Sequence, residues 1–319
     1  VDEVDAVVPI ERLRRALSDP ARTWLRESLG VALPSDDDEP PEHEPLWPES
    51  ARDARQVQRC VERLLAGDDR ARLVRELQCS PTTPAGAAGA IDAEAAVARA
   101  RSLIERALAS SPSTGAPAAA AEPGAGAAQL APRRCEPVVA RVGDLRLRMS
   151  PPALDSHGRL LFVSAYPLGP HALIDAWLRT ALWRFAVDST ATGRLITPDQ
   201  AVEVNCADAL RALEHAIEWS RRISTQPLPL FPRSWLCHAR ELMRGKGRER
   251  VALERAQATL AGDDSGFRTP ELAQPGMRAL YRDAEIDFER VLPLCDRVYR
   301  PIFEDTSLAG SAEAEGAAS

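Results

Sequence analysis

The feature that most constrains the fold is a change in hydrophobic period near the middle of the chain. Residues 137–149 read PVVARVGDLRLRM, and in the second half of this stretch apolar and basic side chains alternate: Leu145, Leu147 and Met149 against Arg146 and Arg148. Such alternation is typical of a β-strand with one buried face. The Gly-Asp pair before it favours a tight hairpin turn. We therefore predict a β-hairpin between regions that are otherwise helical.

A second strand follows the hairpin in GRLLFVSAYPLG, residues 158–169. The run LLFV is apolar on both faces, which is typical of a strand in the interior of a sheet. AVEVN, residues 201–205, is predicted to form a further short strand, and Asn205 is a candidate cap for the helix after it. The predicted helices of this half of the chain are 171–185, 206–223, 234–243, 248–260 and 283–300.

The N-terminal third has the 3.6-residue period of helices instead. Residues 10–29 predict two helices separated by Pro20, because proline interrupts the hydrogen bonding of a helix interior. Residues 51–78 predict a helix that is interrupted at 67–69, and residues 91–108 predict another. These segments have the composition of a helical bundle.

The stretch after these helices is rich in Ala, Pro, Gly and Ser and has few bulky apolar side chains, so it cannot bury enough surface to offset the entropy of ordering. We predict an α+β fold, with a small mixed sheet and a helical wrapper. The predicted parts are a helical N-terminal part (1–109), a flexible excursion (110–132), a core with C-terminal helices (133–305) and a disordered tail (306–319).

Composition limits the classes of protein to which the chain can belong. No apolar run approaches the roughly 20 residues needed to span a bilayer, so we expect a soluble, cytoplasmic protein with no membrane contact. The chain begins at Val1, which suggests a fragment of a longer protein. Six scattered cysteines form no CxxC pair, which favours buried free thiols over a zinc or iron–sulfur site.

Two groups of basic residues are candidates for contacts with DNA. Arg146 and Arg148 share one face of a predicted strand, where they either line a DNA path or pair with acidic groups. The second group lies in RGKGRER, for which a solvated loop at the start of a helix is the alternative: Arg244, Lys246, Arg248 and Arg250. The net charge of -7 argues against a general polyanion-binding surface, because non-specific affinity comes from neutralising phosphates.

Several blocks resemble, in the same order, the RecC C-terminal domain family, a domain of the gamma subunit of exodeoxyribonuclease V. Each block is weakly specific alone, but together they extend over nearly the whole chain. They are IERLRRALSDPARTWLRESLGV (10–31), RQVQRCVERLLAGDDRARLVRELQ (55–78), GDLRLRM (143–149), HGRLLFVSAYPLGPHALIDAWLRTAL (157–182), STQPLPLFPRSWL (224–236) and FERVLPLCDRVYRPIF (288–303).

The resemblance implies an inactive PD-(D/E)xK nuclease core, similar to restriction endonucleases. An active site of this type needs carboxylates for Mg²⁺ and a lysine that acts on the attacking water. In this sequence the first aspartate position holds Ser150, the D-x-K pair holds Ser164 and Tyr166, and the position of a helical histidine holds Ala93. Lys246 is the only lysine in the chain and lies far from these positions in the sequence. We therefore predict that this domain is not an enzyme and binds no metal or cofactor.

The resemblance also implies partners and a process. The complex would be a RecBCD-type ATP-dependent helicase and nuclease, in which this domain supports assembly with RecB-like and RecD-like subunits. It would guide double-stranded DNA ends and unwound strands in double-strand break repair and recombination. The alternatives are an active nuclease of the same fold, an AddB-like subunit, and an unrelated helical interaction module. AddB-type proteins carry an iron–sulfur cysteine where this chain has Asp19, which disfavours the second alternative.

Overall fold

The computed structural model describes residues 7–33, 50–80, 83–109, 136–150, 152–155, 158–262 and 269–308, without the side chains of 50–52 and 109. The predicted excursion 110–132 lies outside the described residues, as do residues 309–319 of the predicted tail. Thr306, in the first part of that tail, is buried and bridges Val204. The packed core therefore continues past residue 305.

The predicted hairpin is confirmed and belongs to a three-stranded sheet, which we call sheet A. Its strands β1 (Val7–Pro9), β2 (Val138–Val142) and β3 (Leu145–Met149) lie in the order β1-β3-β2. β2 is antiparallel to β3 and β1 is parallel to it. Gly143, with a φ of 58°, occupies the left-handed conformation that the tight turn requires.

The predicted interior strand is also confirmed, but it lies in a second sheet, which we call sheet B. Its order is β4-β5-β6-β7, with β5 parallel to β6 and the outer pairs antiparallel. All four residues of β5 are buried. The sequence predicted one small mixed sheet and did not predict β6. The strands of sheet B are β4 (Ala153–Leu154), β5 (Leu160–Val163), β6 (Gly193–Ile196) and β7 (Ala201–Val204).

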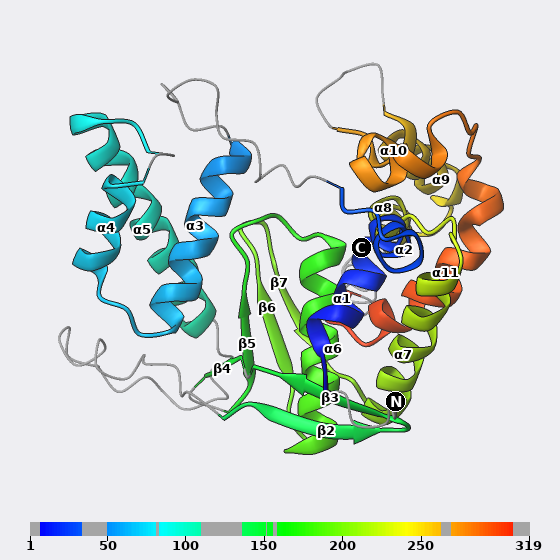
Figure 1. The fold of residues 1–319 in the computed structure, drawn as a ribbon, viewed down its shortest axis with the longest axis horizontal. Coiled ribbons are helices and arrows are strands. Elements are labelled where there is room, and N and C mark those ends of the chain that lie inside the picture. The colour runs from blue at the N-terminus through cyan, green and yellow to red at the C-terminus, as the bar shows by residue number, and fades with distance from the viewer. Residues whose placement is uncertain are drawn as a thin grey trace.

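Helices cover both faces of sheet B, which explains why β5 is apolar throughout. One face packs in the larger hydrophobic core, to which β5 contributes Leu160 and Phe162. The other face contributes Leu161 and Val163 to a smaller core with three helices drawn on the left of Figure 1. These helices, which we call the helical lobe, are α3 (Ser50–Leu65), α4 (Arg70–Gln78) and α5 (Gly86–Ala109).

The remaining helices surround the larger core on the right of Figure 1. The predicted pair at the N-terminus is confirmed, and Asp19 caps its second helix by accepting a hydrogen bond from the Arg22 amide at 3.2 Å. The helices are α1 (Ile10–Ser18), α2 (Pro20–Leu29), α6 (Pro170–Ala186), α7 (Ala209–Thr225), α8 (Pro232–Leu242), α9 (Glu249–Ala261), α10 (Pro275–Tyr281) and α11 (Phe288–Glu304).

Some predicted boundaries and side-chain roles are wrong. Helix α7 is capped by Asp208, whose side chain accepts from the Arg211 amide, and not by Asn205. Helix α5 begins at Gly86, before the predicted start at 91, and α10 was not predicted. Among the described cysteines, Cys60, Cys206 and Cys295 are buried free thiols as predicted, Cys237 is half-buried and Cys79 is exposed. In the described part of the chain, no helix combines the length and hydrophobicity needed to span a membrane.

Candidate functional site

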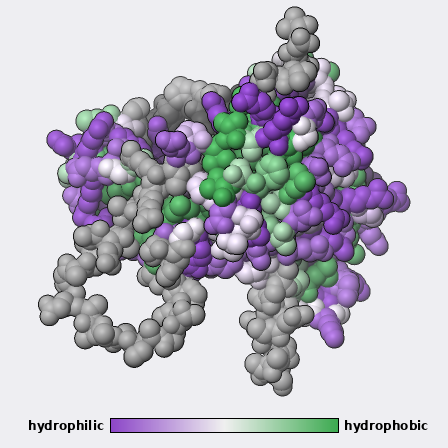
Figure 2. All heavy atoms as spheres, turned by 90° about the horizontal axis from the view of Figure 1, so that it is seen from below, coloured by the Kyte–Doolittle hydropathy of each residue, from purple (hydrophilic) through white to green (hydrophobic). Residues whose placement is uncertain are grey.

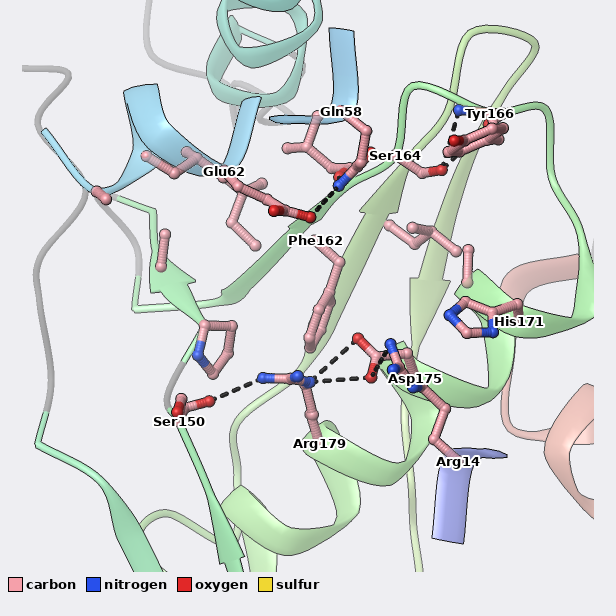
Figure 3. Close-up of a pocket in the computed structure, with 18 residues that line it drawn as sticks. Arg14, Gln58, Glu62, Ser150, Phe162, Ser164, Tyr166, His171, Asp175 and Arg179 are labelled. Carbon is pink, nitrogen blue, oxygen red and sulfur yellow. Dashed lines mark hydrogen bonds and ion pairs between the residues drawn. The ribbon is translucent and has the colours of Figure 1, made fainter. Parts of the chain in front are cut away.

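A cavity of about 680 Å³ lies between the helical lobe and the larger core, beside strand β5. Three of the four predicted nuclease positions line it: Ser150 follows β3, and Ser164 and Tyr166 follow β5. Figure 3 shows that charged and polar groups from α1, α3 and α6 also point into this space. Ala93 does not line the cavity, because it is fully buried within the helical lobe on α5. The structure thus brings three of the four positions together.

The D-x-K spacing predicted that Ser164 and Tyr166 share one face of a strand. They do not, because β5 ends at Val163. Ser164 Oγ accepts a hydrogen bond from the Tyr166 amide at 3.1 Å, which fixes a local turn instead. Ser164 is buried, whereas the Tyr166 side chain is 37% exposed at the mouth of the cavity. A serine in this position therefore stabilises the chain reversal after the strand.

Helix α3 forms one wall and is fastened to the same turn. The Gln58 Oε1 atom accepts from the Ala165 amide at 2.8 Å, and its Nε2 atom donates to Glu62 at 3.1 Å. Burial raises the pKa of the Tyr166 phenol; Arg55 opposes this effect and the charge of Glu62 adds to it. The wall formed by α3 is therefore polar, and the Glu62 carboxylate lies near the Tyr166 phenol.

Arg179 of α6 organises the opposite wall (Figure 3). Its Nη1 atom donates to the Ser150 carbonyl at 2.8 Å, its Nε atom to Asp175 at 3.1 Å, and its Nη2 atom to Glu11 at 2.9 Å. Arg14 approaches Asp175 from α1 at 3.6 Å. One guanidinium thus joins the end of β3 to α1 and α6, in the region where the first nuclease carboxylate was expected.

His171 completes the polar lining near the start of α6. His171 is exposed to solvent on part of its surface, and the walls of the cavity enclose the rest. This enclosure lowers the pKa of the imidazole, the charge of Arg14 lowers it further, and Asp175 opposes both. The surroundings of His171 therefore disfavour the charged form of its ring.

The donor set of the cavity does not fit a Mg²⁺ ion. Magnesium prefers an octahedron of oxygens that includes one or two carboxylates. Here Asp175 is paired with two guanidinium groups, Glu62 accepts from Gln58, and Ser164 Oγ is engaged in the turn. Among the residues that the structure describes, no cluster of three histidine, cysteine or acidic side chains could hold a metal.

The predicted DNA contacts fall in two separate places. Arg146 and Arg148 are exposed on the outward face of sheet A, at the bottom of Figure 1. The other four residues lie between or on α8 and α9, at the upper right of that view: Arg244, Lys246, Arg248 and Arg250. The structure does not bring the two groups together.

Three residues of the second group are engaged in ion pairs, and the pair of Arg248 with Glu241 joins α9 to α8. Glu241 is buried and accepts from Arg248, from Arg244 at 3.0 Å and from Arg255 at 2.7 Å. Burial alone would raise the pKa of Glu241, but the hydrogen bond from Arg248 and the charges of all three arginines lower it. Arg250 pairs with Glu254 at 2.8 Å. These arginines have a structural role, and their contact with DNA stays a prediction.

Sequence reasoning missed the charged residues of the cavity. One signal was available: Asp175 and Arg179 are four residues apart on a helix, the spacing of a surface ion pair. Their third partner, Glu11, lies 168 residues away in the sequence, and no local pattern links it to α6.

Comparison with known proteins gives the family. No curated protein sequence matches the chain. The family model of the RecC C-terminal domain matches residues 5–242, well over half of the chain, and this range contains every residue that lines the cavity. The resemblance is thereby confirmed over residues 5–242, whereas the sequence block at 288–303 lies outside the matched range. The chain belongs to the RecC C-terminal domain family.

Proposed function

We propose that the chain is a non-catalytic domain of a RecBCD-type complex in the cytoplasm, with an inactive PD-(D/E)xK nuclease core. In this proposal the domain supports assembly with RecB-like and RecD-like subunits and guides DNA strands during double-strand break repair and recombination. Family membership supports a place in such a complex. The observation that carries the non-catalytic role is the cavity beside β5, where Ser150, Ser164 and Tyr166 meet.

Electrostatics supports the loss of catalysis. A carboxylate about 4 Å from a unit charge gains about 4 kcal/mol at an effective dielectric near 20, and more against a divalent ion. Neutral Ser150 and Ser164 forfeit this attraction at both metal-binding positions. The remaining charges neutralise one another, since Arg179 and Arg14 engage Asp175. The same guanidinium groups would repel a metal ion.

The non-catalytic role is tested by incubating the full-length RecC-type subunit, without its partners, with linear DNA and Mg²⁺. We expect no digestion above a blank. Digestion that Ser164→Ala or Tyr166→Phe abolishes would overturn the proposal. Ser220→Ala, a buried serine of α7 outside the cavity, is the matched control for non-specific effects of the substitution.

The assembly role is tested by deleting this domain from the full-length subunit and purifying the complex through its RecB-like subunit. We expect the truncated subunit, the RecD-like subunit or both to be missing from the purified material. Recovery of the truncated subunit and the RecD-like subunit at the level of the intact complex would refute the assembly role. Binding of a DNA duplex with single-stranded ends, measured in parallel, tests the guiding role.

A further inference from the structure

The outward face of sheet A is an ordered array of arginine and aliphatic side chains. The register of the strands places Val7, Arg146 and Arg141 in one row across the sheet. Pro9, Arg148 and Val139 form the next row. The opposite face of the sheet is buried against α6 and α7 in the larger core. No acidic residue lies in either row, although the chain as a whole carries a net charge of -7.

The same side of the molecule exposes hydrophobic surface. Figure 2, seen from below, shows hydrophobic side chains gathered over the region where β2, β3 and the lower end of α6 lie in Figure 1. Val139 is 45% exposed and Val7 is 40% exposed, and Phe185 and Val187 are exposed at the end of α6. Contiguous exposed hydrophobic surface marks contact sites for other macromolecules.

Strand β2 adds a third feature, because it is an edge of sheet A. Within the described residues β2 pairs only with β3, so its other side presents main-chain groups that another strand can pair with. Val139 and Arg141 of β2 are two residues apart, so their side chains lie on the same, outward face of the sheet. A strand added beside β2 would place every second side chain on that face as well. An edge of this kind selects an extended partner.

We propose that sheet A binds an extended, acidic segment of a partner subunit, which adds a strand beside β2. Main-chain hydrogen bonds along β2 would give affinity. Acidic side chains of the partner would meet Arg141 and Arg148, and its aliphatic side chains would cover Val139. This proposal rests on the assembly role above and assigns it a surface.

A protein segment fits these residues better than DNA does. Arginines alone would suit phosphates, but phosphate contacts leave valine and phenylalanine side chains exposed to water. Interfaces between proteins, in contrast, combine arginine anchors with apolar surface. The free edge of β2 presents main-chain N–H and C=O groups, and another strand pairs with both, whereas phosphates accept from the N–H groups and offer no donor to the C=O groups.

The test uses the complete complex, with the substitutions Val139→Asp and Arg148→Glu made separately in the full-length subunit. Each side chain is exposed, so we expect folding to be unchanged and the midpoint of thermal unfolding to be preserved. We expect each substitution to weaken the affinity for one partner subunit by about tenfold or more, as for loss of an interface anchor or charge pair. Arg148→Lys should largely restore binding, because it keeps the charge.

Matched controls separate this surface from general effects of charge. Val251→Asp changes an exposed valine of α9, and Arg101→Glu changes an exposed arginine of α5; neither lies on sheet A. We expect both variants to bind both partners normally. Equal weakening by the controls would overturn the proposal.

Three further outcomes would also overturn it. Unchanged affinity for both partners in Val139→Asp and Arg148→Glu would show that sheet A is not the interface. The assembly role itself is tested separately, by deletion of the whole domain. Weaker binding of DNA by Arg148→Glu, with both partners retained, would identify a DNA contact instead. Self-association of the Arg148→Glu and Val139→Asp variants with normal partner binding would show that the charges only protect a strand edge.

Discussion

The two faces of sheet B are covered by cores of different composition. The larger core contains tryptophan, phenylalanine and tyrosine side chains, including Trp177, Trp235 and Tyr299. The smaller core, which the helical lobe forms together with residues of β5 and β6, has no aromatic side chain among its described buried residues, which are alanine, valine, leucine, isoleucine and cysteine. Large aromatic residues bury more area each, so we expect the larger core to be the more stable of the two.

The aromatic residues of the larger core also have polar ends that find partners. The indole nitrogen of Trp177 donates to Asp305 at 2.8 Å, and that of Trp235 donates to Asp296 at 2.7 Å. The Tyr299 hydroxyl donates to the Leu17 carbonyl at 3.0 Å. These bonds fasten the C-terminal helix and the residues after it to α6, α8 and α1. The described buried side chains of the smaller core include no aromatic group that could make such a bond.

The difference in composition between the two cores predicts which side of the cavity opens more easily. One of its walls, α3, belongs to the lobe, and the other, α6, belongs to the aromatic core. Local unfolding begins where the fewest buried contacts are lost. We therefore expect the lobe side of the cavity to exchange amide hydrogens faster than the α6 side.

The largest effect should come from Trp177→Ala in the larger core. The side chain is fully buried and packs edge-to-face against His215. Its removal leaves a large cavity and an unpaired Asp305, so the free energy of unfolding should fall by about 3–5 kcal/mol. Denaturant titration measures the loss. Trp177→Phe keeps most of the volume and should cost less; a loss below about 1 kcal/mol for the alanine variant would contradict this account of the core.

Val61→Ala in the helical lobe should have a smaller and more local effect. Val61 is fully buried on α3, and loss of two methyl groups should cost about 2 kcal/mol. Because the lobe packs as its own cluster, we expect faster hydrogen exchange in α3–α5 and little change in α6–α8. Val202→Ala, the same change in the larger core, is the control. Equal acceleration of exchange in both regions by Val61→Ala would show that the two cores unfold as one unit.

The aromatic core and the central strand could largely be predicted from the sequence. Strand β5 is predictable because an apolar run buried on both faces leaves a local signal. Four tryptophans at helical spacing are all buried: Trp177, Trp183, Trp219 and Trp235. Strand β6 left no such signal. It has four residues, one of them glycine, and its buried Arg194 pairs with Glu203 of β7.

The division into two sheets could not be predicted. It depends on the pairing of β1 with β3, strands that lie at distant places in the sequence. The resemblance indicated three residues that line the cavity, Ser150, Ser164 and Tyr166. The fourth, Ala93, lies elsewhere, because the placement of α5 depends on packing of the whole lobe. Long-range packing and long-range ion pairs leave no periodic pattern in a single sequence.

Arg179→Gln, at the boundary between the two cores, should lower the free energy of unfolding by less than Trp177→Ala or Val61→Ala does. The substitution leaves Glu11 without the Arg179 bond, leaves Asp175 with Arg14 alone, and weakens the bond to the Ser150 carbonyl. The network is largely but not fully buried, so we expect a loss of about 1–2 kcal/mol in the free energy of unfolding, less than for a fully buried pair. Arg101→Gln, which breaks an exposed ion pair of α5, should cost about 0.5 kcal/mol or less. Similar costs for the two variants would show that the Arg179 network is no more than a surface ion pair.

The smallest effect should appear in the pH dependence of stability. The pKa of His171 is below its unfolded value of 6.5. As the pH falls through 6.5 toward the folded pKa, the unfolded chain binds a proton that the folded chain does not, so stability decreases. Above about pH 7 both states are neutral and this contribution is constant. His171→Gln should therefore reduce the loss of stability between about pH 7.5 and 5.5, measured by denaturant titration. His238→Gln, at a histidine of α8 whose pKa is also lowered, should reduce the same loss without changing hydrogen exchange at the cavity. If the pH profile of His171→Gln matches that of the parent chain, the walls of the cavity do not lower the pKa of this ring, and the predicted contribution of His171 to the pH dependence is refuted.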